Sequence, residues 1–89
     1  MEKAYQIQVF GRVQGVGFRY FTQRKAQETD VKGFAKNMPD GSVFIEAEGK
    51  VQDLEVFIQW IKKGPSWAMV TQFNITELPP AGYENFSIH

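Results

Sequence analysis

Residues 10–19 read Phe-Gly-Arg-Val-Gln-Gly-Val-Gly-Phe-Arg, and they mark the change from a predicted strand to a predicted helix. Glycines permit tight turns and a close approach of the backbone to a ligand, so successive N–H groups can converge on one oxyanion beside a helix N-terminus. Arg19 would complete this anion site with a planar, permanently charged guanidinium that matches phosphate oxygens. The spacing G-x3-G-x-G matches neither the dinucleotide fingerprint nor the Walker loop, which argues against nucleotide binding by those routes. The size of the predicted anion site suggests a single phosphoryl group as ligand. From spacing alone, a structural turn with a solvated arginine remains an equal alternative.

The hydropathy pattern outside this stretch predicts alternating strands and helices. Apolar residues with period two indicate strands with one buried face, and apolar residues at helical spacing indicate amphipathic helices. Pro39-Asp40-Gly41 predicts the turn of a hairpin, and Gly64-Pro65 predicts a helix stop. The predicted elements are a strand at Tyr5–Val9, a helix from Phe18 or Arg19 to Thr29 or Asp30, hairpin strands at Val31–Asn37 and Ser42–Glu48, a helix at Val51–Lys63, a strand at Met69–Ile75 and a short last strand at Tyr83–Ile88.

This order of elements predicts an α+β fold. Strand, helix, strand, strand, helix, strand is the β-α-β-β-α-β order of the ferredoxin-like split βαβ sandwich, with two helices on one face of a mostly antiparallel sheet and a short extra C-terminal strand. Right-handed crossovers would place both helices on the same side of the sheet. At 89 residues, we expect a single domain over residues 1–89.

Composition narrows the classes of function. Ten basic residues balance ten acidic ones, which argues against electrostatic capture of nucleic acid or a membrane surface. The chain has no cysteine, and its one histidine, His89, is terminal and expected to be poorly held, so no metal site is predicted. No apolar stretch resembles a signal peptide or a membrane span, and we expect a cytoplasmic monomer.

Asn37 is a second candidate site residue. It ends a predicted strand just before the turn, where an asparagine commonly satisfies local backbone groups. Its amide could alternatively donate to and accept from a water molecule. The first two strands of this fold need not be neighbours, so periodicity does not show whether Asn37 lies near Arg19. In the following strand, Glu46 and Glu48 are expected on the solvent face.

Two separate motifs, the second interrupted by Met38 and Pro39, carry a resemblance to a known family. Residues 11–19 (Gly-Arg-Val-Gln-Gly-Val-Gly-Phe-Arg) are followed by residues 32–37 (Lys-Gly-Phe-Ala-Lys-Asn) and residues 40–43 (Asp-Gly-Ser-Val), and this order closely resembles the acylphosphatase family. The resemblance spans nearly the whole chain. It implies that Arg19 and Asn37 are catalytic, Arg19 by binding phosphate and Asn37 by positioning the attacking water. It also implies a phosphate-binding loop formed by the backbone amides of Arg12, Val13, Gln14, Gly15, Val16, Gly17 and Phe18.

The resemblance implies an enzyme that hydrolyses small-molecule acyl phosphates to a carboxylate and inorganic phosphate, with no metal or cofactor. Phe34 and Lys36 stand where the family commonly has tryptophan and arginine. One alternative is a noncatalytic module that binds phosphate or carbamoyl phosphate. Another is an RNA-binding domain, because residues 32–35 (Lys-Gly-Phe-Ala) mimic the opening of the RNP1 pattern of the RNA recognition motif, although Lys36 and Asn37 then depart from that pattern.

Overall fold

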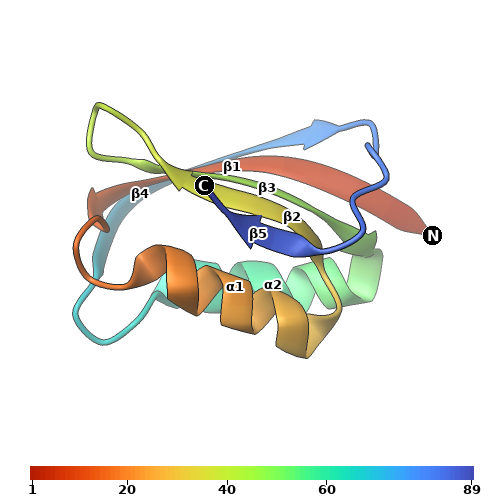
Figure 1. The fold of residues 1–89 in the computed structure, drawn as a ribbon, viewed down its shortest axis with the longest axis horizontal. Helices are drawn as coiled ribbons and strands as arrows, with labels where there is room; N and C mark the ends of the chain where they lie inside the picture. The colour runs from red at the N-terminus through yellow and green to blue at the C-terminus, as the bar shows by residue number, and fades with distance from the viewer.

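The computed structural model describes all of residues 1–89, which form five strands and two helices. Two helices, α1 and α2, cover one face of a single sheet, as Figure 1 shows. In chain order the elements are β1 (Glu2–Arg12), α1 (Phe18–Thr29), β2 (Lys32–Asn37), β3 (Val43–Lys50), α2 (Val51–Lys63), β4 (Met69–Leu78) and β5 (Phe86–Ile88). The split βαβ sandwich with a short C-terminal strand is therefore confirmed.

The strands are ordered β4-β1-β3-β2-β5 across the sheet. Every pairing is antiparallel except that of β2 with β5, which is parallel. Strand β3 therefore lies between β1 and β2, so the segment after β1 and the end of β2 share no backbone ladder. This arrangement matters for the site, because Asn37 ends β2 and the glycine-rich loop follows β1.

The core lies between the sheet and the helices. Alternate residues of the central strands, such as Ile7 in β1 and Ile45 in β3, are fully buried on the helix side. Helix α2 packs Leu54, Phe57 and Ile61 onto them, residues spaced three and four apart on one helical face. Full burial of a side chain of this size contributes ~1.5–3 kcal/mol, so this layer holds the helices on the sheet.

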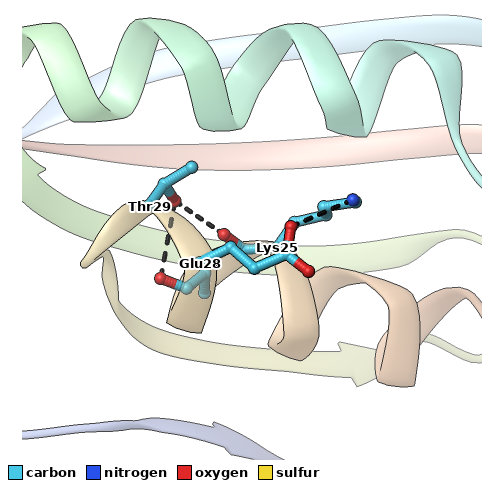
Figure 2. Close-up of polar contacts among 4 residues, drawn as sticks. Lys25, Glu28 and Thr29 are labelled. Atoms are coloured by element: carbon cyan, nitrogen blue, oxygen red, sulfur yellow. Dashed lines mark hydrogen bonds and ion pairs between the residues drawn. The ribbon is translucent and has the colours of Figure 1, made fainter.

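Helix α1 has the predicted bounds and ends in a compact last turn. The hydroxyl of Thr29 donates to the carbonyl of Lys25 at 2.7 Å, and the Lys25 ammonium lies 3.1 Å from the Glu28 carboxylate, as Figure 2 shows. Asp30 follows in the left-handed conformation (φ 59°), and its N–H donates to the carbonyl of Ala26. The Thr29 hydroxyl and the Asp30 N–H thus donate to main-chain carbonyls near the C-terminus of α1, where the helix runs out of backbone donors.

Several strand ends differ from the prediction because partner strands decide them. Strand β1 runs from Glu2 to Arg12, beyond the alternating core of the pattern, since it pairs with both β3 and β4. Strand β4 reaches Leu78, which pairs with Ala4. Strand β5 begins only at Phe86.

The late start of β5 reflects a second difference, the burial of Glu48. The prediction that this carboxylate faces solvent is wrong: Glu48 is 6% exposed and accepts hydrogen bonds from the backbone N–H groups of Ala81, Gly82 and Tyr83 at 2.8–3.2 Å. These amides are thereby committed to a carboxylate instead of a strand ladder. Beside them, the Tyr83 hydroxyl donates to Glu46 at 2.8 Å, and burial together with this carboxylate raises the pKa of Tyr83 to about 12.

Candidate active site

One cavity of about 220 Å³ lies where the β1–α1 loop, the start of α1 and the end of β2 meet. Its walls bring the two predicted catalytic residues together, which the sequence could not establish. Seven residues line it: Val13, Gly15, Gly17, Phe18, Arg19, Tyr20 and Asn37. Of the predicted loop residues, Arg12, Gln14 and Val16 are not part of this lining, and Tyr20 is a lining residue that sequence reasoning missed.

The glycines give the loop its shape. Gly15 and Gly17 have φ values of 74° and 77°, in the left-handed region that residues with a side chain rarely adopt. Gly11, at the irregular step between Phe10 and Gly11 in the β1–β4 pairing, has a different role, because an added Cβ would lie 2.1 Å from the Met69 carbonyl oxygen. Glycine therefore lets the chain leave the sheet beside β4 and then turn back sharply into α1.

The loop and the start of α1 present backbone N–H groups. No residue from 13 to 17 donates a backbone hydrogen bond, and the first N–H of this region that bonds inside the helix is that of Phe21, to the Gly17 carbonyl at 3.0 Å. Gly17 is the N-cap, and no side chain caps this end of α1. Unpaired N–H groups and the positive end of the helix dipole together favour an anion here.

Arg19 lines the cavity from the first turn of α1 and is also tied to the chain end. Its Nη1 donates to the main-chain oxygen of His89 at 2.6 Å. The expectation that His89 is poorly held is wrong. Its N–H donates to the Ala35 carbonyl at 2.9 Å, and its ring stacks on Phe34 with centroids 4.7 Å apart. These contacts fix one side of the guanidinium, while its other nitrogen atoms remain available to a ligand.

Asn37 is held by the hairpin that follows it. The N–H of Met38 donates to the Ser42 carbonyl at 2.8 Å, and that of Gly41 donates to the Met38 carbonyl at 3.1 Å. Asp40 accepts from the backbone N–H of Ser42 at 2.9 Å and from its hydroxyl at 2.5 Å. Both bonds lower the pKa of the Asp40 carboxyl, and the bond from the Ser42 hydroxyl has the larger effect. The turn is thus closed by its own hydrogen bonds, which leaves the Asn37 amide at the cavity wall.

Two further observations bear on the possible ligands. The structure contains no group of three or more His, Cys, Asp or Glu side chains arranged to hold a metal ion, and neither helix has the length and apolar character of a membrane span. Phe34, the aromatic that an RNA recognition motif would offer as a stacking platform, is already stacked by His89 and contacted at its edge by Tyr83.

Comparison with known proteins places this geometry in a family. A family model described as acylphosphatase matches residues 5–88. The chain is 54% identical over 86 residues to an acylphosphatase of Thermotoga maritima, an alignment that covers 97% of this chain and 96% of that protein. The crystal structure of acylphosphatase from Bacillus subtilis superposes with a TM-score of 0.95 at 43% identity, covering 100% of this chain and 99% of that one. Full-length HypF in its phosphate- and nucleotide-bound form matches with a TM-score of 0.90 at 36% identity, over 100% of this chain and 12% of that one.

Proposed function

Because the chain belongs to the acylphosphatase family and is an acylphosphatase, we propose that the glycine loop and Arg19 bind the phosphate of an acyl phosphate while Asn37 orients the attacking water. The observation that carries this assignment is the single cavity that Arg19, Asn37 and the loop line together. The assignment rests on placement and hydrogen bonding, because a guanidinium donates hydrogen bonds and an amide can both donate and accept them.

Binding of the phosphate follows from the charges around the cavity. The loop N–H groups and the N-terminus of α1 supply partial positive charge, and Arg19 supplies a full one. Donors fixed before the reaction stabilise negative charge as it spreads over the phosphoryl oxygens, at no cost of reorganisation. The contact with His89 and the helical backbone both restrain Arg19, so its guanidinium is part of this fixed set.

The chemistry needs few groups. In the reaction, water oxygen forms a bond to phosphorus, the bond from phosphorus to the acyl oxygen breaks, and the electron pair leaves with the carboxylate. Carboxylic acids have pKa values of roughly 4, so this leaving group departs without protonation. A loose, metaphosphate-like transition state makes only a weak demand on the nucleophile, and the water proton can pass to a phosphate oxygen or to solvent. Asn37 would hold the water in line, and the proposed reaction uses no metal and no cofactor.

The test of Arg19 is the hydrolysis of benzoyl phosphate, with and without a chelator. We expect equal rates in both conditions, and a loss on the order of 10²–10³ in kcat/KM for Arg19→Ala, as for removal of one preorganised donor. Arg24→Ala is the matched control, since Arg24 is an exposed arginine on the same helix and does not line the cavity. A folded Arg19→Ala protein with the activity of the control would remove Arg19 from the mechanism.

The role of Asn37 is tested by comparing kcat with the inhibition constant of phosphate. Asn37→Ala should lower kcat strongly while inhibition by inorganic phosphate stays near that of the wild type, because the phosphate donors are untouched. Asn74→Ala, on the exposed strand β4, controls for the loss of an asparagine elsewhere. Unchanged kcat with a raised KM would contradict the water-positioning role.

The similarity to part of HypF suggests one alternative function, which the same assay tests. A noncatalytic module would bind phosphate or carbamoyl phosphate in this cavity and would not turn over benzoyl phosphate. We propose turnover of a small-molecule acyl phosphate, by a protein that acts in the cytoplasm as a monomer. The monomer is supported by the cavity, which residues of one chain line. Sedimentation of the active protein at the mass of one chain, 10.2 kDa, is the expected result.

A further inference from the structure

The Gln14 side chain connects the two halves of the site. From the loop between β1 and α1, its Nε2 donates to the main-chain oxygen of Met38 at 2.8 Å and to that of Ser42 at 2.9 Å. A primary amide nitrogen carries two hydrogens, so both of its donors are used. The side chain is half-buried and does not line the cavity.

Both acceptors belong to the hairpin that carries Asn37. Met38 directly follows Asn37 along the chain, and Ser42 directly precedes Val43, the residue that pairs with Asn37 across the β2–β3 ladder. Gln14 therefore bonds to the chain on each side of the hairpin at the level of Asn37. Its two hydrogen bonds set where this end of the hairpin lies relative to the loop.

The sheet connects the loop and the hairpin only indirectly. Val43 of β3 pairs with Asn37 of β2 and with Val9 of β1, but this ladder reaches β1 before the strand ends and does not include the loop. Gln14 bonds to the hairpin from the loop itself. The hairpin is rigid at the point of contact: Ser42 is 1% exposed, its carbonyl accepts from Met38, and its hydroxyl donates to Asp40 and accepts from Gln8. Because Ser42 is held in place, its hydrogen bond with Gln14 fixes the distance between the hairpin and the loop. A bond to a mobile turn would leave this distance variable.

We propose that Gln14 is a positioning residue that sets the distance between the phosphate-binding loop and Asn37. This inference rests on the proposed function, in which the loop holds the phosphate and Asn37 holds the water. Since in-line attack requires the water at a defined place relative to phosphorus, a small shift of the hairpin lowers the rate of the chemical step and leaves phosphate binding intact.

The first experiment compares Gln14→Leu with the wild type, using benzoyl phosphate and competition by inorganic phosphate. We expect kcat to fall by about ten- to a hundredfold, as for a misplacement of about 1 Å, and the inhibition constant of phosphate to change by less than about threefold. Gln23→Leu is the matched control: Gln23 also donates a long-range bond from a half-buried amide to a main-chain oxygen, that of Phe86, away from the cavity. Equal kcat values for the two variants would overturn the proposal.

A double-mutant cycle with Asn37→Ala separates positioning from general stability. If Gln14 acts through Asn37, then Gln14→Leu in the Asn37→Ala background adds little further loss of kcat. Full additivity of the two losses would overturn the inference even if Gln14→Leu alone is slow. Should Gln14→Leu fail to fold, Gln14→Asn takes its place in the cycle, because it keeps the amide and shortens the side chain by one methylene.

The same cycle keeps this inference distinct from the proposed function. Normal kcat in Asn37→Ala alone would overturn the role of Asn37, and with it the reason for positioning. Collapsed kcat in Asn37→Ala together with normal kcat in folded Gln14→Leu would overturn the inference about Gln14 and leave the proposed function standing.

Discussion

Replacement of Gly17 by alanine tests whether phosphate binding depends on the left-handed conformation of this residue. Gly17 is the N-cap of α1 with φ 77° and ψ 20°, and a Cβ built there meets no atom within 4 Å. The substitution therefore creates no clash, and its whole cost is that of an L-residue in the left-handed region, ~1–2 kcal/mol. Alanine also restricts the unfolded chain, which offsets ~0.4–1 kcal/mol of this cost, so the net loss of unfolding free energy is about 1 kcal/mol.

The protein can respond to Gly17→Ala in two ways. If the loop keeps its shape, the loss appears in the free energy of unfolding measured with urea, and phosphate binds as before. If the loop relaxes, stability is largely kept and phosphate must restore the strained form on binding. Because 1–2 kcal/mol corresponds to a factor of about 5–30, phosphate affinity then weakens by up to this factor.

The assay is urea unfolding with and without inorganic phosphate. Gly82→Ala is the matched control, since Gly82 has φ 84° with no atom within 4 Å of its Cβ and lies in the β4–β5 loop. It should show a similar stability loss with unchanged phosphate affinity. Gly17→Asn should recover part of the loss, because asparagine tolerates the left-handed region better. Full stability together with full phosphate affinity in Gly17→Ala would refute the reasoning.

Three further outcomes follow from the titrating and buried groups. The pKa of Tyr83 is raised from 10.0 to about 12, so the unfolded chain loses this proton first and stability should fall as pH rises from 10 to 12; Tyr83→Phe should lessen that fall in urea titrations. The pKa of Asp40 is lowered from 3.8 by its bonds with Ser42, so its contribution is present above that value and lost as pH falls below it, and Asp40→Asn should lose less stability on acidification than the wild type. Glu48→Ala should lower the free energy of unfolding by at least ~2 kcal/mol, since several backbone amides lose a charged acceptor, with kcat per folded molecule unchanged.

The helices were predictable because local signals decide them. The apolar spacing of Leu54, Phe57 and Ile61 and the Gly64 stop define α2 without reference to the rest of the fold. The ends of the strands and the burial of Glu48 were harder to predict from the sequence. The alternation of β3 correctly puts Glu48 on the face away from the helices, but it contains no information about the β4–β5 loop that buries the carboxylate there.

Within the cavity, the sequence predicted an anion-binding role for the glycine loop and Arg19, and it did not predict the part of the wall that Tyr20 forms. The glycine spacing and Arg19 pointed to the loop because both act locally. Tyr20 lies within the predicted helix and has no sequence signal of its own. Helical side chains lean toward the helix N-terminus, which explains why a residue of the first turn of α1 lines the cavity. The hydrogen bond that Arg19 donates to His89 joins residues 70 positions apart in the chain, so no local sequence signal predicts it.

The placement of Asn37 beside the loop illustrates a general consequence of this topology. The core that stabilises the fold lies between the sheet and the helices. The contacts that hold Arg19 and Asn37 lie at one end of the sheet and are three hydrogen bonds, two donated by Gln14 and one accepted by the main-chain oxygen of His89. The free energy of such bonds, about 1 kcal/mol each, is small beside that of the core. Substitution of Gln14, or loss of the ring stacking that holds His89 on Phe34, can therefore disturb the geometry of the proposed site before it disturbs the fold. Rates, and not unfolding midpoints, are for this reason the sensitive measure of the site.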